Sequence, residues 1–310
     1  MVKDLIYYLV FPGFTFLAVA GGLFSWTDRK ITAWIQFRKG PPLMQPFYDF
    51  FKLLLVKETI LPARGSRLTF LLSPLLGLSG ATVSGILVLL PAFGIRPGFD
   101  GDIIVIFYML TVPSLAYIIG ALAAGNPLAS VGASREMKLI ISYELTFILV
   151  IAAIILKAGM TTGIQDIITA QHEHGAFAGS ISGVLLFIAF IFCLQAKLGF
   201  VPFDMPEAET EITHGCFIEY SGSAYSLIKL TKYIMMFVLP AFLCTLLLGG
   251  FRFDGINGLW SLLKLIGVLL LLTLLRNTNP RIRIDQAMRF FFIWMNLLVI
   301  AAILLNQIHL

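Results

Sequence analysis

The sequence predicts an all-α polytopic membrane protein, with about eight transmembrane helices and one cytoplasmic amphipathic helix. Of its 310 residues, 58% are hydrophobic and only 13% are charged, whereas a soluble domain carries about 25% charged residues. Long apolar runs recur along the whole chain. These observations exclude a single soluble core. No internal repeat or linker is evident, so residues 1–310 are expected to form one membrane domain.

The apolar runs define the expected spans, since each transmembrane helix needs roughly 20 apolar residues. The first run lacks the small-residue cleavage site of a signal peptide. Pro12, Pro74, Pro113 and Pro240 fall inside or near spans, where prolines usually mark kinks because neighbouring helices satisfy the freed carbonyls. The spans are placed at residues 5–26, 68–93, 102–123, 137–157, 180–199, 224–249, 257–276 and 288–307.

Basic residues are divided unevenly between the loops. Of the 22 Lys and Arg residues, 17 fall in or beside loops 1–2, 3–4, 5–6 and 7–8, and the other five lie on the opposite side. The positive-inside rule places those four loops in the cytoplasm, with both termini outside. This topology accounts for the net charge of +5, so no nucleic-acid partner is expected.

The sequence shows no motif for a bound cofactor or metal. Cys193, Cys216 and Cys244 lie far apart and form no C-x-x-C pair for iron–sulfur or zinc binding. No glycine-rich nucleotide motif is present. His172 and His174 would suit a metal if they lay on a strand, but residues 158–179 are expected to be a solvated loop. Any redox cofactor is therefore expected on a partner subunit.

Loop 1–2 contains the predicted amphipathic helix. After Pro46, apolar side chains recur at helical spacing from Phe47 to Leu55, with Asp49, Lys52 and Lys57 off that stripe. The segment is too short to span, which favours a helix at the membrane interface. It is expected to brace the membrane surface and to offer a docking platform for a soluble partner. The residues assigned to docking in this loop are Arg38, Lys39, Gln45, Asp49 and Lys52.

Glu144, which follows Tyr143, lies about two turns inside the fourth span. An ionised acid at mid-membrane costs about 2.5–3.5 kcal/mol on insertion scales, so it must be protonated, paired or facing water. Two interpretations stay open. Glu144 is either part of a static ion pair, with Arg135 or Lys138 as its partner, or a titrating residue on a proton path.

Loop 5–6 concentrates acids in a chain that is otherwise apolar. Asp204 and Glu207 have the spacing of a helix N-cap and its capping box, which is a structural role. On one helix, Glu207 and Glu211 would share a face, where repulsion and burial raise their pKa values. Acids that titrate near neutral pH suit proton transfer. The cluster predicted to form a proton or ion path comprises Asp204, Glu207, Glu209, Glu211, His214 and Glu219.

Loop 7–8 surrounds one acid with four basic residues, Arg276, Arg281, Arg283 and Arg289. Most of this charge is expected to set topology. The remainder would pair with the acids of loop 5–6 or with a partner. Arg281, Arg283 and Asp285 are therefore added to the predicted docking residues.

Taken in order, these segments resemble NADH:quinone oxidoreductase subunit 1, the NuoH type of complex I. The resemblance covers nearly the whole chain, and the loop 5–6 motif is its most specific part. It implies eight spans at the joint between a redox arm and a membrane arm. The matching segments are 38–41 with 45–46, 132–133 with 135, 142–144, 202–204 with 206–209 and 211, 219–222, and 281–286.

Several departures point to a particular branch. Only residues 42–44 separate the Gly-Pro of loop 1–2 from its Gln-Pro, whereas quinone-reducing members have a longer stretch there. Residues 197–200 stand where complex I has an Asn-Arg pair. The run 132–136 resembles the homologous subunit of energy-converting membrane-bound hydrogenases of the Ech and formate hydrogenlyase types.

That branch implies a non-catalytic coupling subunit in a prokaryotic plasma membrane. Reduced ferredoxin would supply electrons for hydrogen evolution, and protons or sodium ions would be driven outward. The implied partners are a nickel–iron hydrogenase large subunit, an iron–sulfur small subunit, a ferredoxin-like subunit and antiporter-like membrane subunits. The nickel–iron centre and iron–sulfur clusters would lie on those partners. Glu144, Tyr143, Arg135 and the loop 5–6 acids would relay charge changes.

Three alternatives are weighed against this interpretation. In a quinone-reducing complex, loops 1–2, 3–4 and 5–6 would line a quinone cavity, and the short loop 1–2 argues against it. A stand-alone transporter often shows inverted repeats, which this sequence lacks. A purely structural anchor would tolerate replacement of Glu144, Glu209 and Glu211 by Gln without loss of ion transport.

Overall fold

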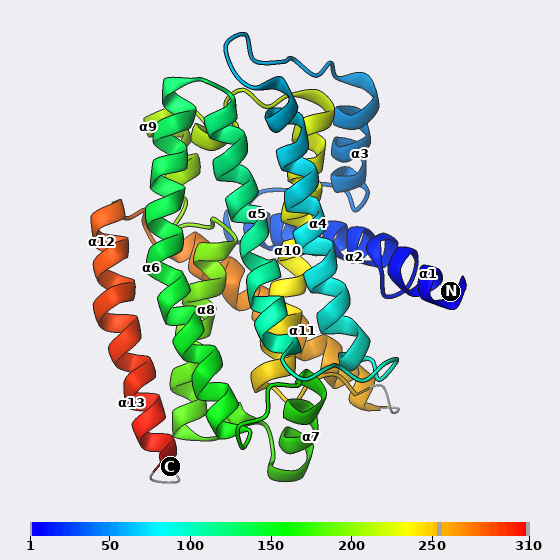
Figure 1. The fold of residues 1–310 in the computed structure, drawn as a ribbon, viewed down its shortest axis with the longest axis vertical. Coiled ribbons are helices and arrows are strands. Elements are labelled where there is room, and N and C mark those ends of the chain that lie inside the picture. Colours follow the sequence, from blue (N-terminus) through cyan, green and yellow to red (C-terminus); the bar gives the residue numbers. More distant parts are fainter. Residues whose placement is uncertain (1, 253–255, 308–310) are drawn as a thin grey trace.

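Long helices that run side by side form most of the protein (Figure 1). The computed structural model describes residues 2–252 and 256–307, apart from the side chains of residues 2–5, 209 and 210. Within these ranges, seven helical segments are long and apolar enough to span a membrane, and α8 is a shorter apolar helix of 17 residues. Each of the eight predicted spans is therefore a helix, which confirms the predicted fold class.

The helices that correspond to the predicted spans are α2 (Phe14–Ile35), α4 (Arg67–Ala92), α5 (Asp102–Ala123), α6 (Pro127–Lys157), α8 (Ile181–Lys197), α10 (Gly222–Leu247), α11 (Ile256–Thr278), and α12 (Ile284–Arg289) continued by η5 (Phe290–Met295) and α13 (Asn296–Gln307). The short helix α1 (Val2–Leu9) precedes α2. Pro12 separates α1 from α2, so this proline marks a break rather than a kink. Pro74, Pro113 and Pro240 lie inside α4, α5 and α10.

Two helices extend well beyond their predicted ends. α6 begins at Pro127 rather than at residue 137, because the side chain of Asn126 accepts a hydrogen bond from the Leu128 amide and Pro127 occupies the first turn. α2 continues to Ile35 rather than ending at residue 26. Because of these extensions, Asp28 and Arg29 lie on α2, and Arg135 and Glu136 lie on α6.

α10 lies at the centre of the bundle and is buried along almost its whole length. It contacts α2, α4, α8 and α11. Gly21 permits the close approach of α2, since a Cβ atom there would lie 2.3 Å from the Tyr233 carbonyl oxygen of α10. Glycine at this position therefore sets the separation of the two helices.

The four basic loops meet at one end of the bundle, which we call the charged end. Ion pairs join loop 5–6 to loop 3–4 and to loop 7–8 there, and Gly65 of loop 1–2 lies against Ala123 at the end of α5. The predicted amphipathic helix is α3 (Gln45–Phe51) with its π-helical continuation η1 (Lys52–Val56). Phe47 packs against Gly22 of α2, while Leu55 is 76% exposed.

The predicted loop at residues 158–179 is wrong in its middle, where α7 (Ile164–His174) lies at the opposite end of the bundle (Figure 1). Ile164, Ile167, Ile168 and Gln171 are buried on one face. Their spacing is the helical i, i+3, i+4, i+7 pattern, so the signal was present in the sequence. Within the described ranges, no group of three or more His, Cys, Asp or Glu side chains could hold a metal ion.

Candidate functional site

Loop 5–6 folds into three short turns that pack against α6: η3 (Met205–Glu207), α9 (Glu209–Ile212) and η4 (Gly215–Phe217). Gly132 of α6 permits this packing, because a Cβ atom there would lie 2.5 Å from the Cys216 amide nitrogen. The turns are separate, so Glu207 and Glu211 do not share the face of one helix as predicted.

The predicted capping box is also wrong. The side chain of Asp204 makes no capping hydrogen bond. Its Oδ2 atom lies 2.7 Å from Nε of Arg281 in loop 7–8 instead. The Arg281 guanidinium gives this carboxylate a charge-assisted hydrogen bond, which is among the stronger kinds in proteins. Pairing of loop 7–8 with the loop 5–6 acids is thereby confirmed for Asp204.

Burial decides the protonation behaviour of Asp204, which lies outside the spans. Burial raises the pKa of this carboxyl group, and the charge of Arg281 lowers it by less, so the pKa stays above its ordinary value. Its Oδ1 atom is buried and has no hydrogen-bond partner among the described residues. Asp204 is thus an acid that holds its proton more tightly than a solvated aspartate does.

Two further ion pairs join loop 5–6 to the spans. Glu211 lies 2.5 Å from Nη1 of Arg135, and Arg135 also donates to the Met205 carbonyl at 3.3 Å. Glu211 is 59% exposed, so this pair contributes little stability, about 0–1 kcal/mol. Glu207 binds Nζ of Lys232 through both carboxylate oxygens, at 2.7 and 2.6 Å. Three predicted relay acids of loop 5–6, Asp204, Glu207 and Glu211, are thus each paired with a cation.

Glu144 is paired, but its partner differs from the prediction. Its Oε1 atom lies 2.5 Å from Nζ of Lys197 of α8, and the Lys197 side chain is 0% exposed against 13% for Glu144. Neither Arg135 nor Lys138 contacts it in any described ion pair. The reason is geometric, since α8 packs beside α6 at the depth of Glu144. The second oxygen, Oε2, is buried without a hydrogen-bond partner among the described residues.

Aromatic rings surround the Lys197 ammonium group. The rings of Tyr143 and Phe147 lie 5.2 and 5.1 Å from Nζ, and Nζ also donates to the Leu110 carbonyl at 3.4 Å. Ring faces attract cations most strongly where water is excluded. Tyr143, a predicted site residue, is therefore buried beside the charge that neutralises Glu144.

A small cavity connects these ion pairs. It is lined by Glu136, Lys197, Glu207 and Lys232, together with Ser114 and Tyr117, and has a volume of about 20 Å³. That volume holds about one water molecule. Glu136 of α6 lines this cavity together with the two lysines. We call Glu207, Lys232, Glu136, Lys197 and Glu144 the buried charge chain, which leads from the charged end into the bundle. The side chain of Lys197 is fully buried and the other four residues are partly buried.

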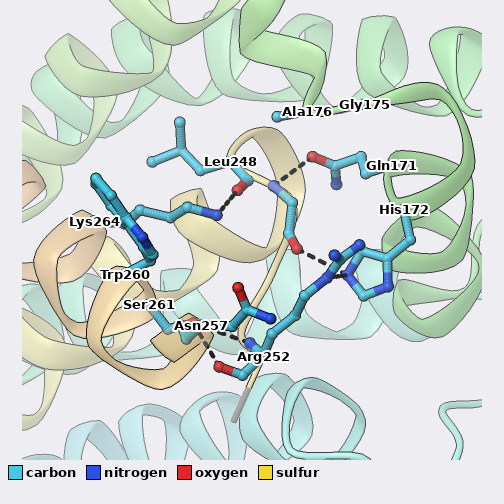
Figure 2. A pocket seen from close by; sticks show the side chains of 11 residues that line it. Gln171, His172, Gly175, Ala176, Leu248, Arg252, Asn257, Trp260, Ser261 and Lys264 are labelled. Atoms are coloured by element: carbon cyan, nitrogen blue, oxygen red, sulfur yellow. Dashed lines mark hydrogen bonds between the residues drawn. The ribbon is translucent and has the colours of Figure 1, made fainter. Parts of the chain in front are cut away.

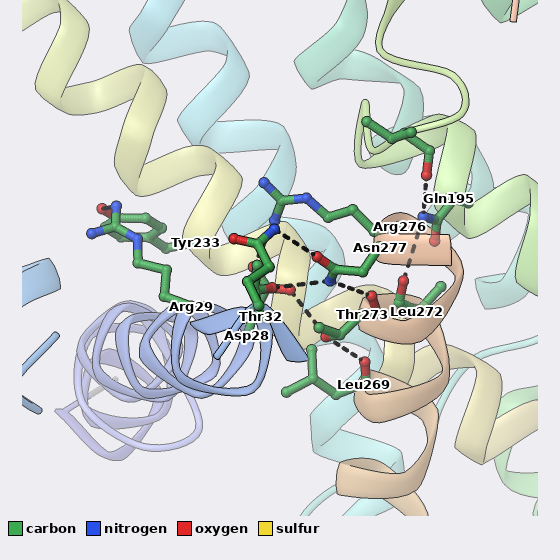
Figure 3. A network of polar contacts seen from close by, with 12 residues as sticks. Asp28, Arg29, Thr32, Gln195, Tyr233, Leu269, Leu272, Thr273, Arg276 and Asn277 are labelled. Atoms are coloured by element: carbon green, nitrogen blue, oxygen red, sulfur yellow. Dashed lines mark hydrogen bonds and ion pairs between the residues drawn. The ribbon is translucent and has the colours of Figure 1, made fainter. Parts of the chain in front are cut away.

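A second cavity of about 240 Å³ shares Glu207 and Lys232 with the first and is also lined by Asp28, Arg29 and Arg276. Figure 3 shows Asp28 of α2 facing α11. Asp28 is buried; its carboxylate lies 2.7 Å from Nη1 of Arg276 and accepts a 3.0 Å hydrogen bond from Thr273. These contacts fix the charged ends of α2 and α11 to each other.

The amphipathic helix is tied to α2 by two predicted docking residues. Asp49 lies 3.0 Å from Nη1 of Arg29 and accepts a 2.8 Å hydrogen bond from Gln45. Arg29 also donates to the Tyr233 hydroxyl at 3.3 Å. Burial raises the pKa of Asp49, but the Arg29 and Gln45 hydrogen bonds outweigh it and hold this pKa below its ordinary value. Gln45 and Asp49 therefore have an intramolecular role, whatever they contact in a partner.

The other predicted docking residues lie at the surface of the charged end. Arg38 and Lys39 line a cavity of about 290 Å³ that also includes Asp28 and Arg276, and Arg38 donates to Gln36. Lys52 is exposed. Arg283 and Asp285 are exposed and border a cavity of about 250 Å³ with Arg135 and Glu211.

Besides Asp204, Glu211, Arg135 and Tyr143, three more predicted relay residues lie apart from the buried charge chain or outside the described residues. Glu219 accepts a 2.5 Å hydrogen bond from Asn126, the N-cap residue of α6, which is a structural contact. His214 is exposed and has a left-handed backbone, with φ of 74°. The side chain of Glu209 lies outside the described residues.

Sequence reasoning gave no site role to Asp28, Glu136, Lys197, Lys232 or Arg276. The two lysines were counted only as topology signals. Lys197 and Lys232 nevertheless lie inside the predicted spans 180–199 and 224–249, and an ionisable residue inside a membrane span is by default a functional candidate. That signal would have found both.

Comparison with known proteins gives consistent matches over nearly the whole chain. The family model described as NADH dehydrogenase matches residues 6–307. The H-type subunit of NADH-quinone oxidoreductase from Thermomicrobium roseum is 36% identical, over 92% of this chain and 90% of that protein. Its counterpart from Brevibacillus brevis is 32% identical, over 92% and 87%.

A solved structure also shares the fold. It is a chain of the membrane-bound sulfane sulfur reductase, an archaeal respiratory membrane complex. The two chains superpose with a TM-score of 0.87 at 26% identity, over 98% of this chain and 99% of the other.

Proposed function

The chain belongs to the NADH dehydrogenase family, to which the H-type subunit of NADH-quinone oxidoreductase is related across its length, and from this premise we propose that it is the coupling subunit of a respiratory membrane complex. Redox subunits dock at the charged end, which faces the cytoplasm of a prokaryotic cell. The chain itself holds no redox centre. It couples a change of charge in the docked redox subunits to ion transport by other subunits in the membrane.

The observation that carries this proposal is the buried charge chain. A relay requires two states that interact differently with the triggering event. Glu136 lines the same cavity as Lys232 and Lys197, so it offers each lysine an alternative to Glu207 or Glu144. When a negative charge near Glu207 holds Lys232 there, Glu136 is free to draw Lys197 away from Glu144. When that charge leaves, Lys232 turns to Glu136, and Lys197 keeps the Glu144 contact that the structure shows.

The redox partners we propose are those of an energy-converting hydrogenase: a nickel–iron large subunit, an iron–sulfur small subunit and a ferredoxin-like subunit, with antiporter-like subunits in the membrane. Residues 42–44 of loop 1–2 and the run 132–136 support this branch. The related chain of a sulfane sulfur reductase complex supports the broader point that this fold serves more than one electron acceptor.

A quinone-reducing complex is the second candidate. It is favoured by the relatives whose names place them in NADH-quinone oxidoreductase and by the 240 Å³ cavity beside Asp28 and Arg276. That volume is below the range of about 300–1,000 Å³ that is usual for small-molecule sites, which makes it the weaker of the two.

The intact complex, purified through a tag on this chain, tests the branch. We expect hydrogen evolution from reduced ferredoxin and a co-purifying nickel–iron subunit. Quinone reduction without nickel would move the chain to the quinone branch, and sulfane sulfur reduction would move it to that of the structural relative.

Vesicles that contain the complex test the relay. Glu136→Gln removes the alternative partner of both lysines, so it is expected to leave redox turnover intact in detergent but to reduce coupled ion transport roughly tenfold, within the factor of about 5–150 that is typical of coupling between two sites. The matched control is Glu173→Gln, an exposed acid at the opposite end of the bundle. Equal ion transport in Glu136→Gln and the control would refute the relay and leave a structural anchor.

A further inference from the structure

A cavity of about 400 Å³ lies at the end of the bundle opposite the charged end, where α7, α10 and α11 meet. Figure 2 shows Arg252, from the segment after α10, and Lys264 of α11 bordering it with Asn257 between them. No acid is present among the described residues that line it. Two cations therefore border the cavity, although this end of the chain is poor in basic residues.

Both cations are positioned by hydrogen bonds that leave donors for a ligand. Nζ of Lys264 donates to the Leu248 carbonyl at 2.5 Å, and an ammonium group has three donors. Nε of Arg252 donates to Nε2 of His172 at 3.0 Å, and the terminal guanidinium nitrogens carry four more N–H groups. An oxyanion between the two side chains would accept from both.

The cavity lies on a helix that borders the bilayer. α11 is long and apolar enough to span the membrane, and the cavity residues Trp260, Ser261 and Lys264 belong to its first turns. Trp260 is 60% exposed. Trp and Lys side chains near the end of a span lie at the level of lipid headgroups. An anion that enters this cavity from the bilayer would be a lipid phosphate.

An open surface continues from the cavity into the apolar part of α11. Trp260, Lys264, Gly267 and Leu271 follow one another at spacings of four, three and four residues, so they share one face of the helix. A Cβ atom at Gly267 would meet no other atom within 4 Å. This bare stretch lies one turn deeper than Lys264, where the acyl chain of a headgroup-bound lipid would run.

We propose that the cavity between Arg252 and Lys264 binds the phosphodiester headgroup of an anionic membrane lipid, whose acyl chain lies along the Gly267 face of α11. The volume of about 400 Å³ suits a headgroup and falls at the lower end of the range for small-molecule sites. The site is remote from the buried charge chain, so it does not depend on which redox partner docks.

The test uses the full-length chain purified in detergent, with bound lipid counted by native mass spectrometry after titration with phosphatidylglycerol or phosphatidylcholine. We expect tight retention of one phosphatidylglycerol and weaker retention of phosphatidylcholine. Arg252→Gln is expected to weaken phosphatidylglycerol binding roughly fivefold, the effect of one cation near the surface. Arg252 is the first choice because its replacement preserves the Lys264 bond to the Leu248 carbonyl.

Two variants make the result specific. Arg96→Gln removes an exposed cation at the same end of the bundle that does not line the cavity, and it is expected to bind lipid as the parent does. Gly267→Leu fills the bare face without a clash, and it is expected to weaken phosphatidylglycerol binding while leaving binding of soluble glycerol phosphate unchanged.

Three outcomes would overturn the proposal. In the first, Arg252→Gln retains phosphatidylglycerol as well as Arg96→Gln does. In the second, inorganic phosphate displaces the retained lipid at equal concentration, which would make this a site for a free anion. In the third, Gly267→Leu leaves phosphatidylglycerol binding unchanged, which would show that the acyl chain does not lie along α11.

Discussion

Replacement of Lys197 by Met tests the most consequential contact in the bundle. The substitution leaves the Glu144 carboxylate in place, 13% exposed and without its partner at 2.5 Å. At an effective dielectric constant of 20, two charges at that separation attract by about 7 kcal/mol, most of which offsets the cost of burying them. Removal of one partner from a buried pair costs about 3–5 kcal/mol, and we expect Lys197→Met to lose stability in this range.

The assay is reversible unfolding of the purified chain in detergent micelles, followed by the fluorescence of its four tryptophans. The control is Lys138→Met, an exposed lysine on α6, which is expected to change stability by less than about 0.5 kcal/mol. The double variant Lys197→Met with Glu144→Leu removes both charges and is expected to recover most of the loss. A loss below about 1 kcal/mol in Lys197→Met, or no recovery in the double variant, would refute a buried pair.

Three further outcomes follow from other contacts. Arg276→Gln breaks the tie between α2 and α11 at Asp28 and is expected to cost about 1–3 kcal/mol of unfolding free energy, whereas the exposed Arg283→Gln is expected to cost little; equal losses would refute the tie. Burial raises the pKa of Asp204 above its ordinary 3.8, so the folded state binds the Asp204 proton more tightly than the unfolded chain does. The stability that this proton contributes is therefore complete below pH 3.8 and is lost as the pH rises through the folded-state pKa. Asp204→Asn is expected to remove that decline from a pH series of unfolding midpoints, and a decline of unchanged size would contradict the assignment. Gly21→Ala places a Cβ atom 2.3 Å from the Tyr233 carbonyl oxygen and is expected to destabilise by about 1–3 kcal/mol, while Gly267→Ala, with open space around it, is not; similar values for the two would show that α2 can shift away from α10.

The membrane architecture could be predicted because it depends on local composition. Span positions follow from runs of apolar residues, which are costly to expose. The grouping of the four basic loops follows from an even alternation of spans and from charge counts. The amphipathic helix at α3 and η1 follows from side-chain spacing within a dozen residues. α7 is equally local, but its segment is polar overall, so its buried stripe stands out less than the apolar runs of the spans do.

The sequence by itself determined a helical membrane protein of one family, with its acids gathered in loop 5–6 and at Glu144. Only the tertiary structure decided which cation each acid meets. Lys197 lies 53 residues from Glu144, and Arg281 lies 77 residues from Asp204. Such pairs depend on which helices pack together and at what depth, as α8 and α6 do at Lys197 and Glu144. A buried charge selects its partner by distance in space, which no local pattern in the sequence records.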